Sequence, residues 1–153
     1  MTLSINEQSN ELVHMIEHLM YGHNYQVTIG HEELNAKTII DAMNELKMIY
    51  PEADTRTISD STIDDVFDKI EIGFDYRGDD GAGLKIQPNV EINLKDLQCK
   101  YFLMIKKYIN QNTKVYHLIS CGGIPGYPVF RDYRFYLINS NNPSCFIYGS
   151  SSD

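Results

Sequence analysis

The sequence predicts an α+β fold: an antiparallel or mixed β-sheet of about five to six strands, with three to four helices packed mainly on one face. Amphipathic helical patterns recur in the first two thirds of the chain, and segments rich in aromatic and β-branched residues fill the last third. Short turn-forming links join these later segments, which is typical of antiparallel neighbours. We expect a single globular domain over residues 1–149 and a disordered tail over 150–153.

Three elements are predicted in the first fifty residues. Ser4 and Glu7 fit a capping box, and apolar residues follow at steps of three and four, which predicts a helix over residues 4–21. Residues 25–29 alternate between apolar and polar side chains and predict a short strand. Residues 31–50 return to the helical period and predict a second helix.

A short acidic helix is predicted after a polar loop. Residues 51–62 have no periodic apolar pattern and are predicted to form the loop, after which Asp60 or Ser61 caps the helix. Its apolar residues would face inward and leave three carboxylates in water, those of Asp64, Asp65 and Asp68.

The clearest period-two alternation of the chain lies in residues 70–76 and 84–94. Alternation of this kind places the apolar side chains on one face of a strand. Residues 77–83 contain three glycines and two aspartates, which favour a turn. We therefore predict a β-hairpin with an acidic tip. Its second arm is an edge strand or contains a bulge, because Pro88 cannot donate a ladder hydrogen bond.

The last third of the chain is predicted to supply most of the sheet. A helix is expected first, from about residue 93 to residue 109. Residues 114–120, 129–138 and 145–148 are then predicted as strands. The second of these is apolar on both faces, so it belongs in the middle of the sheet.

The net charge of −8 is unevenly distributed along the chain. The first eighty residues contain seventeen Asp and Glu against five Lys and Arg, a net charge of −12, and the remainder carries +4. Nucleic-acid binding depends on neutralising phosphates with Lys and Arg, so a nucleic-acid partner is not expected. An acidic half favours a basic protein partner, although acidity also serves solubility.

Two groups of residues resemble catalytic patterns. His14, Glu17 and His18 match HxxEH, in which two histidines one helical turn apart hold zinc and the glutamate acts as base. Cys121, with His117 and Asp132 nearby in sequence, supplies the residue types of a thiol nucleophile, base and orienting group. Neither pattern is specific, so we expect no metal, no cofactor and no catalytic residue.

The three cysteines are widely spaced and form no CxxC pair, so reduced and mostly buried thiols are expected. Residues 121–128, with their glycines and prolines, form either a binding loop anchored by Tyr127 or only a connection between strands. No apolar run reaches the ~20 residues of a membrane span, and no signal peptide is evident. A cytoplasmic protein with no membrane partner is therefore expected.

The function that joins these features is that of a small acidic protein that binds another protein. We expect a bacterial immunity protein or antitoxin that blocks the active site of a basic, nuclease-like toxin. The alternatives are a small metal- or thiol-dependent enzyme, or a subunit of a larger assembly that pairs through the hairpin edge. The residues expected to meet the partner are Asp64, Asp65, Asp68, Asp75, Asp79, Asp80 and Tyr127.

Overall fold

The computed structural model describes residues 5–19, 26–75, 88–126 and 131–152, with some side chains near the ends of these ranges left out. Within them lie four helices and one five-stranded sheet, as an α+β fold requires. The helices are α1 (Ile5–Leu19), α2 (Ile39–Ile49), α3 (Ile63–Asp75) and α4 (Pro88–Lys106). The strands are β1 (Gln26–Leu34), β2 (Ile58–Ser61), β3 (Lys114–Leu118), β4 (Arg131–Ile138) and β5 (Ser144–Ser152).

All neighbouring strands are antiparallel, in the order β1-β5-β4-β3-β2. The expected sheet is thus confirmed, and β4 lies at its centre as predicted from its two apolar faces. Tyr133, Phe135 and Leu137 point to one face of β4, whereas Tyr136 and Ile138 point to the other. The strand β5 pairs with β1 through Ser152, so it extends into the stretch expected to be a disordered tail.

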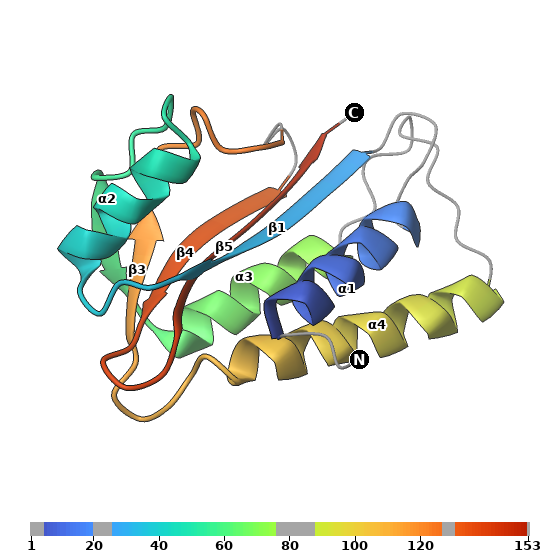
Figure 1. Cartoon of the computed structure of the whole chain (residues 1–153). Coiled ribbons are helices and arrows are strands. Elements are labelled where there is room, and N and C mark those ends of the chain that lie inside the picture. Colours follow the sequence, from blue (N-terminus) through green and yellow to red (C-terminus); the bar gives the residue numbers. More distant parts are fainter. Residues whose placement is uncertain (1–4, 20–25, 76–87, 127–130, 153) are drawn as a thin grey trace.

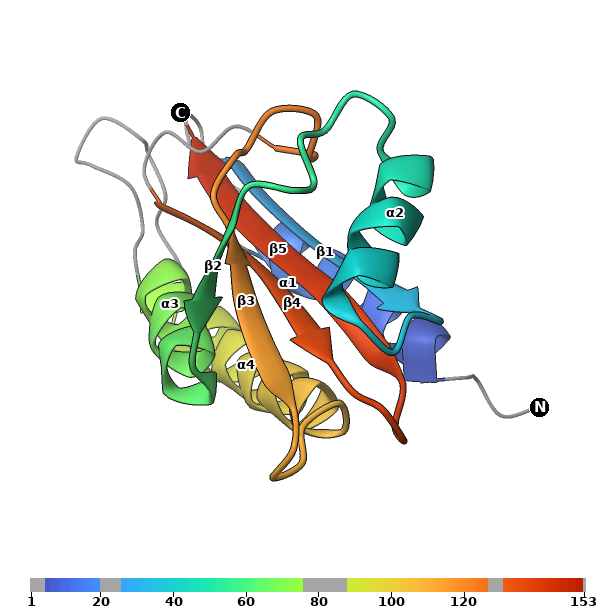
Figure 2. The same cartoon turned by 90° about the vertical axis from the view of Figure 1, so that its left-hand side faces the viewer.

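Helices cover both faces of the sheet: α1, α3 and α4 lie on one face and α2 lies on the other (Figures 1 and 2). Apolar residues of α1, α3 and α4 form one core with Ile29, Phe135 and Ile147 of the sheet. On the opposite face, α2 packs against Tyr136 and Phe146. The expectation that the helices lie mainly on one face is therefore confirmed, with α2 as the exception. None of the described helices is long and apolar enough to cross a membrane.

The predicted hairpin is wrong, because both of its described arms are helical. Ile70 is fully buried and Ile72 is 47% exposed, although a strand would place both on the same face. Likewise Leu94 is fully buried while Ile92 is 71% exposed. Helical spacing explains these values, because residues two apart lie on nearly opposite sides of a helix.

The helix α3 continues the apolar period of the acidic helix predicted before it, and α4 begins earlier than predicted. Pro88 is the first residue of α4, where its missing N–H leaves no hydrogen bond unmade. One alternative was a subunit of a larger assembly that pairs through the edge of the predicted hairpin. The described arms are helices and offer no such edge. The tip, residues 77–83, lies outside the described residues.

Two further boundaries differ from the expectation. Residues 31–34 continue β1 and do not begin a helix, because β1 pairs with β5 along all nine of its residues. The strand β2 lies within the predicted loop and pairs with β3 at the edge of the sheet. The cap of α3 is Thr62, whose Oγ1 accepts a hydrogen bond from the N–H of Asp65 at 3.1 Å.

The side chain of His31 is polar but buried on the three-helix face. His31, on β1, is 5% exposed, and its ring centroid lies 5.1 Å from that of Tyr108. Neither ring nitrogen finds a hydrogen-bond partner among the described residues. Burial lowers the pKa of His31 from 6.5 to about 4, because the charged form loses its hydration.

We predict that His31 makes the protein less stable in mild acid. Unfolded His31 binds a proton near pH 6.5 and folded His31 only near pH 4, so the free energy of unfolding should fall as the pH drops from about 6.5 to about 4. The loss attributable to His31 is roughly 3 kcal/mol. Urea unfolding of wild type and His31→Leu at pH 7 and pH 4.5 measures it, with the exposed His14→Gln as the control. An equal loss on acidification in wild type and His31→Leu would contradict this assignment.

We also predict that Gly73→Ala stabilises the protein. Gly73 lies inside α3, and a Cβ added there has no neighbouring atom of the described residues within 4 Å. Alanine in a helix interior is favoured over glycine by about 0.8–1.0 kcal/mol. Gly123→Ala is the contrasting variant, since Gly123 has φ of +81° and its added Cβ would lie 2.5 Å from the N of Ala53. Thermal and urea unfolding should rank Gly73→Ala above wild type and Gly123→Ala below it, and the opposite order would argue against the helix.

Candidate functional site

The sheet opens into a groove where β3 leaves β4. Pairing of these strands ends at His117 and Phe135, whereas β3 continues beside β2, with Leu118 opposite Ile58. The opening has a volume of about 380 Å³, at the lower end of the range for small-ligand sites. We call it the sheet-split groove, and it is lined by Ser59, Asp60, Ser61, Asp65, Lys69, His117, Asp132, Tyr133, Arg134 and Phe135.

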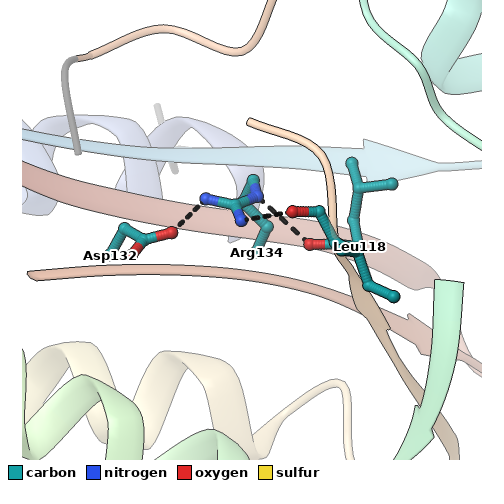
Figure 3. Close-up of polar contacts among 4 residues, drawn as sticks. Leu118, Asp132 and Arg134 are labelled. Carbon is teal, nitrogen blue, oxygen red and sulfur yellow. Dashed lines mark hydrogen bonds and ion pairs between the residues drawn. The ribbon is translucent and has the colours of Figure 1, made fainter. Parts of the chain in front are cut away.

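Arg134 connects the two strands at the point where their backbone pairing stops (Figure 3). Its Nε donates to the carbonyl oxygen of Leu118 at 3.1 Å, and its Nη2 donates to that of Ile119 at 2.9 Å. Its Nη1 donates to the carboxylate of Asp132. Arg134 is only 7% exposed, and a charge buried to this degree requires an ion pair and hydrogen bonds. Asp132 and the two carbonyl groups supply them.

His117 lines the groove from β3. Burial lowers the pKa of His117, and so does the positive charge of Arg134. Asp132 and Asp65 act in the opposite direction, and Lys69 lowers the pKa further. Since the net shift is downward from 6.5, the imidazole is mainly neutral at pH 7 and presents one nitrogen that accepts hydrogen bonds.

The fixed charges of the groove leave a negative excess. Asp132 and Arg134 form an ion pair and neutralise one another. The remaining charged lining residues are Asp60 and Asp65, which are negative, and Lys69, which is positive. One negative charge therefore lacks a positive counterpart among the lining residues. A groove with this balance attracts a ligand that carries one positive charge.

Exposed carboxylates extend from the groove along α3. Between Ile58 and Gly73 there are five exposed carboxylates and one lysine, Lys69. Within the described part of the chain, none of the five is in an ion pair. Three of them follow one another on α3 at steps of four and three residues and so lie on one stripe of the helix. We call the five residues the acidic face: Asp60, Asp64, Asp65, Asp68 and Glu71.

Several carboxylates from the acidic half of the sequence are used inside the fold. Glu17 accepts a hydrogen bond from the N–H of Ile29 on edge strand β1 at 2.9 Å. Glu45 accepts from two N–H groups, those of Asn35 and Ala36, at 2.9–3.0 Å. The acidity of the sequence is thus divided between internal contacts and the acidic face.

The predicted partner-binding residues fall into two groups. Asp64, Asp65 and Asp68 are all exposed on α3, so the structure brings these three together. Asp75 is the last residue of α3, and its side chain is outside the described part, as are the whole of Asp79, Asp80 and Tyr127.

The HxxEH residues have other contacts in the structure. His14 Nδ1 lies 3.1 Å from the Glu17 carboxylate on the exposed side of α1, and Glu17 also binds the backbone of β1. The side chain of His18 is outside the described part. Among the described residues there is no group of three His, Cys, Asp or Glu placed to hold a metal ion.

The residues of the predicted thiol site lie in two different places. His117 and Asp132 line the sheet-split groove, whereas Cys121 lines a smaller pocket that adjoins the groove at Tyr133 and Arg134. No hydrogen bond joins Cys121 to His117 in the described part of the chain. The prediction that the cysteines are mostly buried is wrong, because Cys99 and Cys121 are exposed and only Cys145 is buried.

Sequence reasoning missed the groove as a site. No sequence pattern gives a role to Lys69 or Arg134, and His117 and Asp132 are predicted only as partners of Cys121. One signal was present: Arg134 and Asp132 interrupt a strand that is otherwise strongly apolar. Buried charges within a central strand need partners, which points to a special position.

We predict that Arg134 is required for stability at the sheet split. Arg134→Met keeps the apolar stem but leaves the two carbonyl groups and Asp132 without their donor, which should lower the free energy of unfolding by about 3–5 kcal/mol. The matched control is Arg56→Met, because Arg56 is exposed and a single side-chain bond joins it to Asn44. Urea unfolding compares the two variants, and similar small losses in both would refute the role of Arg134.

Comparison with known proteins identifies no family. No protein-family model matches the sequence, and no curated protein matches it. Among solved structures, that of citrus MAF1 is similar with a TM-score of 0.48 and 10% sequence identity, over 92% of this chain and 98% of that chain. A likeness this distant says nothing about the function of this chain.

Proposed function

We propose that this protein binds and neutralises a basic protein through the acidic face, in the manner of an immunity protein or antitoxin acting on a nuclease-like toxin. The observation that supports the proposal is the placement of the five carboxylates on β2 and α3, with no ion pair among the described residues. Carboxylates left unpaired in this way keep their full attraction for a cationic surface.

The fold holds these carboxylates in fixed relative positions. Val66 and Ile70 of α3 are fully buried against the sheet, which leaves the acidic stripe facing outward. On β2, Asp60 is held in register with β3 by its pairing with Tyr116. A preorganised surface of this kind loses little conformational entropy when it binds.

The mechanism follows from the charge of a nuclease-like partner. Such an enzyme binds the phosphate backbone of its substrate with Lys and Arg. Carboxylates that lie against those residues would occupy the substrate groove and exclude phosphate. Long-range attraction would speed association, whereas buried pairs at the centre of the interface would slow dissociation.

We predict that reversing charge on the acidic face abolishes capture of the partner. Wild type, a variant with Asp64, Asp65 and Asp68 changed to Lys, and a control with Glu11, Asp41 and Glu52 changed to Lys are immobilised and exposed to host lysate. Both variants change the net charge equally, and all six residues are exposed. A basic protein should be retained by wild type and by the control but lost from the acidic-face variant.

The purified partner then permits a kinetic test. Its association rate with the acidic-face variant should fall on the order of 10- to 100-fold at low ionic strength and depend less on salt. Wild type should also inhibit the partner's nuclease activity. Equal slowing by both variants would mean that net charge alone acts, and an unchanged rate with the acidic-face variant would reject this surface.

A further inference from the structure

We propose that the sheet-split groove is a socket for a single arginine side chain of the partner protein. This inference rests on the proposed function and assigns the chemistry of its central contact. Four features of the groove support it: its charge balance, its aromatic wall, its free hydrogen-bond acceptors and its size.

The charge balance favours one cation. The ion pair between Asp132 and Arg134 is internal, and Arg134 is held by two carbonyl groups as well, so it is not free to bind an anion. Asp60 and Asp65 exceed Lys69 by one negative charge. A single guanidinium would bring the groove to neutrality.

The aromatic wall favours guanidinium over ammonium. The ring centroids of His117 and Phe135 lie 5.4 Å apart, and those of Phe135 and Tyr133 lie 6.4 Å apart with an interplanar angle of 24°. All three residues line the groove. Phe135 and Tyr133 are buried behind the half-buried ring of His117, so His117 offers the face on which a planar, weakly hydrated guanidinium can stack. An ammonium is a compact and strongly hydrated charge and gains less from such a ring.

Acceptors for the guanidinium N–H groups are available in the same groove. Oδ2 of Asp65 accepts one hydrogen bond, from Ser61 Oγ at 3.1 Å, and Oδ1 has no partner within the described residues. The neutral imidazole of His117 adds one acceptor nitrogen. The volume of about 380 Å³ accommodates one long side chain but not a folded element.

The socket couples arginine binding to the protonation of His117. A protonated imidazole would place a second cation beside the guanidinium, so affinity should fall as the pH drops through the pKa of His117. The charged groups that share the groove with this ring come from three elements: Asp65 and Lys69 of α3, Asp60 of β2, and Asp132 and Arg134 of β4. By linkage, bound arginine should lower the pKa of His117.

Titration with a small arginine probe tests the socket without the partner. N-acetyl-L-arginine amide is added to ¹⁵N-labelled protein at pH 7.5, with N-acetyl-L-citrulline amide as the uncharged isostere and N-acetyl-L-lysine amide as the ammonium comparison. We expect saturable shifts at Asp65 and His117 with arginine, weaker binding of lysine, and none with citrulline. The imidazole resonances of His117 should titrate at lower pH when arginine is present.

Two substitutions on α3 distinguish arginine binding in the groove from general electrostatic attraction to the acidic face. Asp65→Asn removes the groove carboxylate and should weaken arginine binding at least about fivefold. Asp64→Asn is the matched control, because Asp64 is the adjacent exposed carboxylate and does not line the groove. Equal binding of citrulline, equal binding of lysine, or an equal loss in both variants would overturn the socket.

The titration with the arginine probe is independent of the capture experiment that tests the proposed function. If the probe binds as described and no basic protein depends on the acidic face, the socket stands and the proposed function falls. If a basic partner is captured through the acidic face but the probe does not bind, the socket is wrong and the proposed function stands.

Discussion

The buried side chain of Arg134 determines how the sheet opens. It takes the place of a backbone pair where β3 leaves β4, and it satisfies two carbonyl groups that would otherwise lose their partners. An ion pair with Asp132 offsets the cost of burying its charge. Because side-chain bonds replace the ladder here, the strands can diverge without leaving buried polar groups unsatisfied. The sheet-split groove is the direct consequence.

The carboxylates of the chain serve two physical purposes. Glu17 accepts a hydrogen bond from the N–H of Ile29 within β1, and Glu45 accepts from the N–H groups of the two residues that follow β1. Tyr50 donates to Glu32 of β1 at 2.7 Å. These contacts satisfy or cover polar groups near an edge strand that would otherwise remain open to pairing with another chain. Within the acidic face, Asp65 accepts a hydrogen bond from Ser61, and Asp64 and Asp65 lie in the first turn of α3, where a carboxylate favours the helix. None of the five carboxylates of the acidic face is in an ion pair within the described part of the chain.

The groove and the acidic face depend on each other through α3. One side of this helix supplies Asp65 and Lys69 to the groove, while its outer stripe carries Asp64 and Asp68. Burial of Val66 and Ile70 fixes the rotation of the helix, and with it both surfaces. A partner that is attracted by the stripe would thus meet the groove at the same time. Under the proposed function, α3 would therefore supply both the attraction of the partner and its central contact.

Local pattern by itself determined the central position of β4, the three C-terminal strands and the exposure of the α3 carboxylates, because these follow from side-chain chemistry over a few residues. It did not determine the secondary structure of residues 70–75 and 88–94, where the apolar residues alternate. The helix is decided there by the contrast between buried Ile70 and exposed Ile72, and between buried Leu94 and exposed Ile92. The groove also required the tertiary structure, since Arg134 binds Leu118 across sixteen residues, and His117 of β3 lines the groove together with Asp65 of α3. Sequence proximity cannot reveal such contacts, because strand pairing and helix packing create them.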